Sequence, residues 1–399
     1  MSDGTGTISL VVTVPSLSNN ANHVKTGRIT TARPGPFVRD SEQKTAGNSY
    51  AGSNDTAGNT IPRRRRNSGR ATITDVAEAA GVARITVSRA LNDPGTVSPD
   101  LRKRIDAAVS QLGYVPNRHA GSLASATSTM VPLIVPSLSN AVFLEVIRGA
   151  QIVLEAEGYG LLLGNTDYDP AREQKLIQNL LGWSPVGTIV AGLRHSEGTI
   201  KMLQRWGGPC VEIMEYGTPN IDMAVGLSHQ AAGAAMARHF LSRGYRRVGF
   251  AGTRLEMDYR AGQRLDGFRA ALDQAGVGLE FVKRYDGISN VALGGRAIRD
   301  VVAEHPMAEA VFFANDDLAV GAILGAQRAG IAVPDDIAVA GFNGLSLGNH
   351  VTPRLTTIVS PRLRMGRRAA EMLLTRIRGE ALPQKVRDIG FRLLAQEST

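Results

Sequence analysis

Between residues 72 and 113, apolar positions recur three to four residues apart, a spacing that predicts three short helices. The first begins at Thr72, because its hydroxyl and the carboxylate of Asp75 form the pattern of a capping box. Gly81 follows the last apolar position of this helix, where a residue without a Cβ accommodates a left-handed turn. A second helix then covers residues 84–92. Two helices around so tight a turn are typical of a helix-turn-helix motif, although an ordinary helical hairpin has the same pattern.

Beyond residue 129 the pattern changes to short apolar runs that alternate with amphipathic segments. The apolar runs predict strands at 131–135, 159–164, 187–191, 211–214, 247–251 and 310–313. The amphipathic segments predict helices at 141–158, 171–183, 197–206, 228–244, 264–276, 294–305 and 318–329. Strands that alternate with helices are typical of parallel sheets covered on both faces, so this part of the chain is predicted to be α/β.

Three stretches of sequence carry a family resemblance: DVAEAAGVARITVSRALN (75–92), VSPDLRKRI (97–105) and LGYVPNRHAGSLA (112–124). They closely resemble the headpiece and hinge of the lac repressor/galactose repressor family (the LacI family) of bacterial transcription regulators. Later stretches, including VPSLSNAVFLEVIRG (135–149) and VPDDIAVAGFNG (333–344), are most similar to the gluconate-operon repressors of that family. The resemblance implies a periplasmic-binding-protein-like module of two parallel-sheet lobes, with its ligand in the cleft between them.

The periodicity and the resemblance together divide the chain into four segments. These are an extension (1–70), a helix-turn-helix headpiece (71–116), a hinge helix (117–127), and an effector-binding and dimerisation domain (128–399). The resemblance further implies that each lobe combines two separate stretches, 128–227 with 356–382 and 228–355 with 383–399.

The extension is rich in Gly, Ser, Thr and Asn and lacks a sustained period, so we expect it to be disordered. It ends near the arginine run at 63–66, which can add contacts to phosphates beside the headpiece. Alternatively, the segment is absent from the natural protein because the start codon was placed too far upstream. Members of the family usually begin a few residues before the first helix.

Composition narrows the class of protein. The 399 residues carry a formal net charge of +9, which favours a polyanionic partner without identifying it. The single cysteine, Cys210, excludes an internal disulfide and fits a reducing cytoplasm. No apolar run approaches the ~20 residues of a membrane span. Motifs for nucleotide binding, zinc proteolysis and serine hydrolysis are missing. We therefore expect a cytoplasmic protein that is not an enzyme and has no metal, cofactor or membrane partner.

The second helix is the predicted reader of DNA. In the family its first two positions, here Arg84 and Ile85, set base preference in the major groove, and Arg89 also reaches a base. An arginine can donate two hydrogen bonds to guanine, whereas Ile85 can contact only a thymine methyl group or respond to shape. Polar side chains around this helix are expected to contact phosphates: Thr72, Thr74, Thr86, Ser88 and Asn92.

The hinge is a second predicted contact with DNA. Asn117 can cap a short helix that continues through Arg118 and Ala120 to Leu123. In the family, paired hinge helices enter the minor groove, and a leucine at the position of Leu123 wedges between base pairs. Gly121 costs about 1 kcal/mol of helix propensity and weakens this helix. A passive linker is the alternative.

The resemblance places a small effector in the cleft and implies contacts from Ser137, Asn140, Phe143, Arg264, Asn315, Asp316 and Asn343. The guanidinium of Arg264 suits a carboxylate or vicinal hydroxyls. Asn343 stands where sugar-binding members often have Asp, and the loss of that negative charge favours an anionic effector. The pair Asn315-Asp316 is explained equally well by the cap of a helix.

These features predict a dimeric repressor that binds double-stranded operator DNA. A sugar acid such as gluconate, acting as inducer, is expected to relieve repression by binding the cleft. A corepressor-dependent, purine-type regulator is the first alternative. The solute-binding protein of a transporter is a weaker one, because such a protein needs a signal peptide and no headpiece.

The wedge assigned to Leu123 predicts the effect of one substitution. Leu123→Ala shortens the wedge, so affinity for the operator should fall more than affinity for random DNA of the same length. Fluorescence anisotropy at one salt concentration measures both affinities. An equal loss on the two DNAs would contradict this role.

Overall fold

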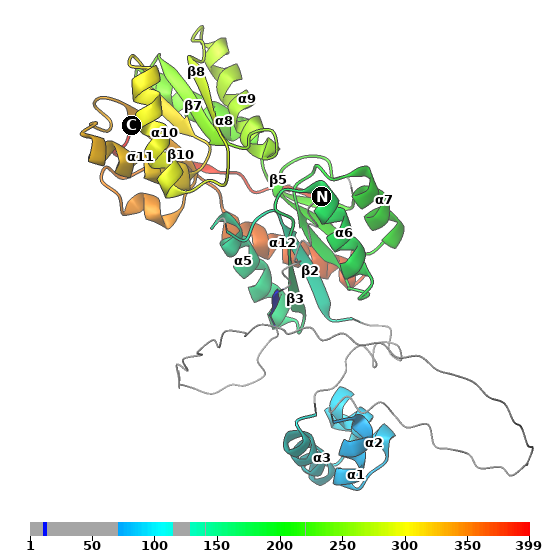
Figure 1. Cartoon of the computed structure of the whole chain (residues 1–399). Helices are drawn as coiled ribbons and strands as arrows, with labels where there is room; N and C mark the ends of the chain where they lie inside the picture. Colours follow the sequence, from blue (N-terminus) through cyan, green and yellow to red (C-terminus); the bar gives the residue numbers. More distant parts are fainter. Residues whose placement is uncertain (1–10, 14–70, 115–127, 140, 220) are drawn as a thin grey trace, which may run out of the picture. The chain divides into compact units, whose positions relative to one another are not determined.

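The computed structural model describes residues 11–13, 71–114, 128–139, 141–219 and 221–399 (Figure 1). The chain forms two compact units. The headpiece is one of them, and the two-lobed module with its associated N-terminal strand is the other. The predicted hinge helix, with Asn117, Arg118, Ala120 and Leu123, lies outside the described residues, as does Asn140.

The headpiece consists of α1 (Ile73–Ala80), α2 (Arg84–Asn92), the short 3-10 helix η1 (Pro94–Thr96) and α3 (Pro99–Leu112). Its core takes one large side chain from each α-helix, since Val76, Val87 and Ile105 are all fully buried. Small residues such as Ala77 and Ala80 lie between them and allow the helices to approach closely. The three helices predicted from the spacing are therefore present.

The ends of α1 follow the local sequence signals. The Thr72 hydroxyl accepts a hydrogen bond from the Asp75 N–H at 3.3 Å, and the Asp75 carboxylate accepts one from the Thr72 N–H at 2.7 Å. This is the predicted capping box. At the other end Gly81 has a φ of +64° and donates its N–H to the carbonyl of Glu78. This left-handed residue redirects the chain toward α2, and glycine is favoured there because it has no Cβ.

The first lobe contains a sheet in the order β1-β3-β2-β4-β5-β6-β12. Its parallel strands are β2 (Met130–Val135), β3 (Gly160–Asn165), β4 (Thr188–Ala191), β5 (Cys210–Glu215), β6 (Met223–Leu227) and β12 (Val386–Asp388), and β1 (Val11–Thr13) pairs antiparallel with β3. Helices α5 (Val142–Ala156) and α12 (Arg362–Ile377) cover one face, and α6 (Pro170–Leu181) and α7 (Glu197–Trp206) cover the other. Along β2, Leu133 faces the first layer and Ile134 the second.

The second lobe contains a sheet in the order β13-β11-β10-β9-β7-β8. Its strands are β7 (Val248–Thr253), β8 (Phe281–Tyr285), β9 (Ala310–Phe313), β10 (Ala338–Asn343) and β11 (Thr356–Val359), which are parallel, and the antiparallel β13 (Arg392–Leu394). Its helices are α8 (His229–Ser242), α9 (Tyr259–Gln274), α10 (Val291–Glu304), α11 (Asp316–Ala329) and the 3-10 helix η2 (Ser346–Asn349). Phe312 packs toward α8 and α9, whereas Phe313 packs toward α10 and α11.

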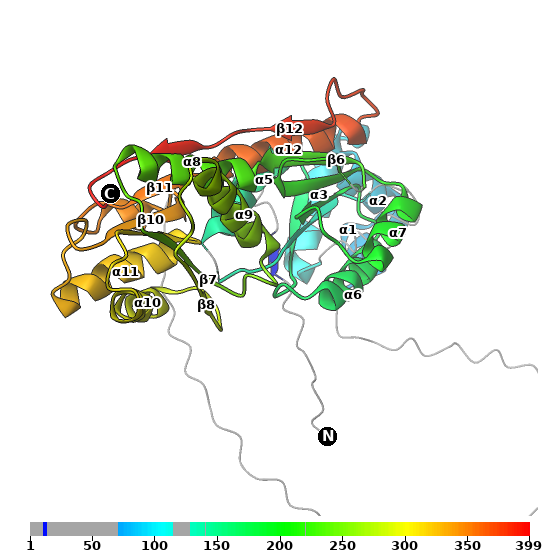
Figure 2. The same ribbon diagram turned by 90° about the horizontal axis from the view of Figure 1, so that it is seen from above.

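The boundaries between the lobes differ from those expected. Thr356–Val359 is strand β11 of the second sheet, so the chain enters the first lobe only at α12 rather than at residue 356. It also stays there longer, because β12 at 386–388 still pairs with β6. The segment drawn in orange and red then returns to the second lobe at β13 (Figure 2). Val11–Thr13 forms a strand within the stretch that was expected to be a disordered extension.

Three helix pairs approach closely because each helix places a glycine at the crossing. An ideal Cβ on Gly294 of α10 would lie 2.1 Å from the Leu318 carbonyl oxygen, and one on Gly321 of α11 would lie 2.1 Å from that of Val291. The same reciprocal arrangement joins Gly149 of α5 with α12, and Gly233 of α8 with α9. Any side chain at these positions would push the helices apart.

Gly294→Ala tests this packing. The added methyl group would overlap backbone that cannot rotate away, so the free energy of unfolding should fall by about 1–3 kcal/mol. Gly278→Ala is the matched control, because its Cβ would meet nothing within 4 Å. Urea denaturation measures both variants. Equal stability of the two proteins would contradict the role given to the crossing.

Candidate DNA-binding face and effector cleft

One face of α2 is free of the headpiece core. Val87 and Ala90 point inward, whereas Arg84, Ile85 and Arg89 are exposed. Ile85 is 63% exposed and is not part of the headpiece core, so its side chain is available for a contact outside the headpiece. An apolar side chain flanked by two guanidiniums on one helix suits the edges of bases in the major groove.

The polar residues predicted to contact phosphates surround this face. Thr72 is exposed at the start of α1, and Thr74, the second residue of that helix, is partly buried. Thr86 and Ser88 are partly buried on α2, and Asn92 is its last residue. Thr72 is also the N-cap of α1, so its hydroxyl already accepts one hydrogen bond. The described part of the predicted DNA-binding set therefore lies on α1 and α2.

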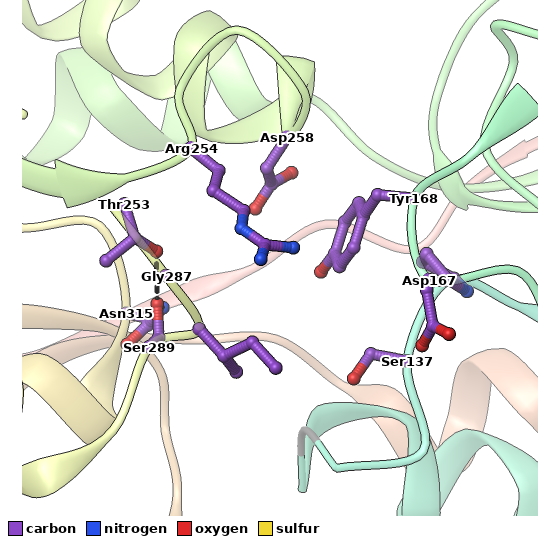
Figure 3. Close-up of a pocket in the computed structure, with 11 residues that line it drawn as sticks. Ser137, Asp167, Tyr168, Thr253, Arg254, Asp258, Gly287, Ser289 and Asn315 are labelled. Atoms are coloured by element: carbon purple, nitrogen blue, oxygen red, sulfur yellow. Dashed lines mark hydrogen bonds between the residues drawn. The ribbon is translucent and has the colours of Figure 1, made fainter. Parts of the chain in front are cut away.

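The two-lobed module contains a cavity of about 360 Å³ between its lobes (Figure 3). The first lobe contributes Pro136, Ser137, Asp167 and Tyr168, and the second contributes Thr253, Arg254, Asp258, Gly287, Ile288, Ser289 and Asn315. Each of these residues follows, or ends, a parallel strand at its carboxyl end. This edge is where open α/β sheets bind their ligands.

One wall of the cavity is a connected polar cluster on the second lobe. The hydroxyls of Thr253 and Ser289 are 2.7 Å apart, and the Asn315 side-chain amide donates to the Ser289 hydroxyl at 2.8 Å. The side-chain oxygen of Asn315, Oδ1, accepts from the Leu318 N–H and caps α11. Asn315 therefore serves both the helix cap and the cavity wall, the two roles that the sequence left open.

The predicted effector residues fall into two groups. Ser137 and Asn315 line the cavity, as predicted. Phe143, Arg264, Asp316 and Asn343 are buried beside or behind its walls instead.

The Asp316 carboxylate accepts from the Thr357 hydroxyl at 2.7 Å and from the Leu345 N–H at 2.6 Å, which ties α11 to β11. Burial outweighs these bonds and raises the pKa of Asp316 to about 6. Phe143 packs in the core under α5, and the carbonyl of Asn343 accepts from Arg362.

Arg264 is held in a closed set of contacts. Its guanidinium donates to His229 Nδ1 at 3.0 Å and to the Ala314 carbonyl at 2.9 Å, and it lies 4.1 Å over the ring of Phe342. Burial lowers the pKa of Arg264 to about 10. Burial, together with the charge of Arg264, also lowers the pKa of His229, which is therefore neutral and accepts through Nδ1. A contact between Arg264 and an effector stays a prediction.

The sequence reading missed most of the cavity wall, including Tyr168, Arg254 and Asp258. The sequence did indicate their position, because all three follow predicted strands. It did not indicate the backbone conformation of two of them: Tyr168 has a φ of +62° and Arg254 a φ of +46°. These left-handed conformations direct the two side chains into the cavity, and no local sequence pattern predicts such conformations at non-glycine residues.

A tyrosine joins the two lobes beside the cavity. Tyr259, the first residue of α9, donates its hydroxyl to the Glu215 carboxylate at the end of β5. The same hydroxyl accepts from the N–H groups of Leu193 and Arg194 at 3.0 and 3.2 Å. Burial raises the pKa of Tyr259 well above its usual value, so the phenol stays protonated and can donate.

Two family models match the chain. The model of bacterial regulatory proteins of the lacI family matches residues 72–117, and that of the periplasmic binding protein-like domain matches residues 237–399. The chain is 42% identical over 337 residues to the HTH-type transcriptional regulator GntR of Pseudomonas aeruginosa, which covers 84% of this chain and 97% of the relative. The chain belongs to the lacI family.

Other relatives agree with this membership. The HTH-type transcriptional regulator GntR of Escherichia coli is 40% identical over 81% of this chain and 97% of its own. A LacI-family transcriptional regulator from Silicibacter pomeroyi, of known structure, is 41% identical with a TM-score of 0.78, covering 82% and 99% of the two chains. This lacI-family protein is thus a DNA-binding transcription regulator, and double-stranded operator DNA is its partner. No helix among its described residues has the length and apolar character needed to cross a membrane.

In this lacI-family module, a buried charged cluster supports the loop that Tyr259 contacts. The His195 side chain is fully buried, with Nδ1 2.8 Å from Glu173 and Nε2 3.0 Å from the Gly192 carbonyl and 3.6 Å from Glu212. Burial alone lowers the pKa of His195, but the two carboxylates outweigh it and raise the pKa to about 9. In the described part of the chain, no group of acidic, His and Cys side chains is arranged to hold a metal ion.

This cluster predicts a pH dependence of stability. Because folding raises the pKa of His195, its contribution is complete below pH ~6.5 and is lost as pH rises through about 9. His195→Gln should therefore cost about 3 kcal/mol near pH 6.5 and progressively less toward pH 10. Chemical denaturation across this range measures the difference from the wild type. His350→Gln, at an exposed position, is the control. A difference that stayed constant with pH would exclude His195 as the titrating group.

Proposed function

We propose that this regulator is a dimeric repressor whose hold on operator DNA is released by a sugar acid. The observation that carries the proposal is the cavity at the strand ends, in a chain that also has an exposed reading face on α2. A protein with both parts can couple a small molecule to DNA affinity, provided that the ligand binds the free and DNA-bound states differently.

The headpiece supports reading of a defined base sequence. Arg84 and Arg89 can each make two hydrogen bonds to a guanine, and Ile85 offers an apolar contact for a thymine methyl group. A single headpiece of this size covers only half a site, so two copies on a pseudo-palindromic operator are expected. A homodimer supplies the second copy. Binding to chromosomal DNA places the protein in the cytoplasm.

The chemistry of the cavity supports a polyhydroxylated anion. Ser137, Thr253, Ser289 and Asn315 offer hydroxyl and amide groups, which match the hydroxyls of a sugar chain. Arg254 offers a positive charge for a carboxylate. The resemblance to gluconate-operon repressors indicates the same class. The ligand is bound and released unchanged, without catalysis.

A purine-type corepressor is the second candidate. A cavity at this position can equally stabilise the DNA-bound state, and the sign of the effect follows from differential affinity rather than from the site itself. The wall offers Tyr168 as its aromatic group, and an aromatic side chain can stack on a planar base.

Operator binding tests both candidates. The probe is a fluorescent duplex from upstream of the protein's own gene, titrated with protein at fixed salt in the presence of D-gluconate, related sugar acids, neutral sugars or purines. We expect a sugar acid to weaken binding by about 5- to 150-fold at saturation, as typical coupling energies of 1–3 kcal/mol imply. Tightening by a purine would favour the corepressor, and indifference to every sugar acid would contradict the proposal.

A further inference from the structure

The charged side chains around the cavity differ in whether they already have partners. The Asp167 carboxylate is ion-paired with Arg172 and accepts a hydrogen bond from the Asn165 amide at 2.7 Å. The Asp258 carboxylate accepts from the Ala261 N–H and lies 3.9 Å from the guanidinium of Arg260. Both acidic groups thus have a cationic neighbour within their own lobe.

Arg254 is the exception. Its side chain extends into the cavity toward Tyr168 and Ser137 on the opposite lobe (Figure 3). Across the described ranges, no carboxylate oxygen lies within 4.0 Å of its guanidinium. A guanidinium that faces a cavity without an anion is suited to bind one from solution, through two parallel hydrogen bonds to a carboxylate.

The backbone holds this side chain in place. Arg254 has a φ of +46°, in the left-handed region that residues with a Cβ rarely adopt. Its N–H donates to the Tyr285 carbonyl at 3.2 Å, and its own carbonyl accepts from Met257 and Asp258, each at 2.8 Å. Three hydrogen bonds therefore maintain a strained conformation whose effect is to direct the side chain into the cavity. Strain of this kind is concentrated at ligand-binding positions.

The other arginine near the cavity is already engaged. Arg264 donates through one Nη to His229 and through the other to the Ala314 carbonyl, and its planar face lies over Phe342, while its buried Nε has no hydrogen-bond partner among the described residues. It is 4% exposed and does not line the cavity. Arg254, which lines the cavity, is therefore the arginine that a ligand there meets directly.

We infer that Arg254 is the residue that selects an anionic effector, by binding its carboxylate across the cavity from Tyr168. The hydroxyl and amide wall of Thr253, Ser289 and Asn315 then receives the hydroxyl groups of the same molecule. This inference rests on the proposed sugar-acid effector and assigns the charge recognition to one side chain. Affinity for the uncharged analogue depends on the wall and not on Arg254.

Calorimetric titration with two probes tests the assignment. D-gluconate and D-gluconamide carry the same hydroxyl groups and differ in the charge at the first carbon. The wild type should bind gluconate at least tenfold more tightly than gluconamide. In Arg254→Gln, gluconate should bind roughly 10- to 100-fold more weakly, with gluconamide changed by less than about threefold, because only the charged hydrogen bonds are lost.

Three further variants complete the design. Arg254→Lys keeps the charge without the planar pair of donors and should lie between the wild type and Arg254→Gln. Arg254→Asn removes the charge with a residue that tolerates the left-handed backbone, so it decides the question if Arg254→Gln unfolds. Arg328→Gln removes an exposed arginine near the end of α11 and should match the wild type with both probes. Thermal unfolding verifies that each variant is folded.

The outcomes separate the inference from the proposed function. If the wild type binds gluconate and Arg254→Gln or Arg254→Asn keeps its preference over gluconamide, the assignment of Arg254 is wrong and the sugar-acid effector stands. If both probes weaken equally, Arg254 acts on the cavity as a whole, and charge selection by it is also wrong. If the wild type binds no sugar acid, the proposed effector class fails, and the inference fails with it.

Discussion

The parallel direction of neighbouring strands is the constraint on which this molecule's chemistry depends. In each of the two sheets the carboxyl ends of the parallel strands lie along one edge, so the segments at the ends of β2 and β3 lie together in the first lobe, and those at the ends of β7, β8 and β9 lie together in the second. The residues that line the cavity come from the ends of these five strands and the segments that follow them. Glycine pairs such as Gly294 and Gly321 allow the covering helices to pack closely. The strand order therefore determines which segments form the wall, and the side chains on those segments determine its polarity.

The contacts between the lobes lie next to this wall, which gives a ligand the means to alter their arrangement. Tyr259 begins the helix that follows Asp258 and binds Glu215 and the Leu193 N–H of the other lobe. His229 donates through Nε2 to the Met214 carbonyl across the same gap, while its Nδ1 accepts from Arg264. A molecule that draws Arg254 toward Tyr168 would act on these same hydrogen bonds between the lobes. Such a junction, with discrete hydrogen-bonded partners, can have two stable arrangements rather than a continuous range.

Most of the fold was predicted from the sequence, and the predictions that were wrong or missing have physical causes. Alternating apolar strands and amphipathic helices gave the α/β class, and the capping box and Gly81 gave the ends of α1. The lobe boundaries expected at 356 and 382 were wrong because they came from the resemblance, whereas β11 and β12, of four and three residues, are too short for their periodicity to assign them to a sheet. In the cleft, the resemblance implied Ser137 and Asn315, and both lie just after the ends of strands. Arg254 was missed because a left-handed backbone, held by two local hydrogen bonds and one to the distant Tyr285 carbonyl, decides where its side chain points.

The path of the chain through the two lobes has a consequence for how such regulators can be recombined. The backbone passes from one lobe to the other after β6, after β11 and again between β12 and β13. Exchanging one lobe between two relatives therefore requires three compatible junctions, each within packed structure. The headpiece, by contrast, is one continuous stretch with its own core at 71–114. Exchange of this one stretch, which lies between β1 and the first lobe in sequence, can give an existing sensor a new DNA sequence to read without a new junction inside either lobe.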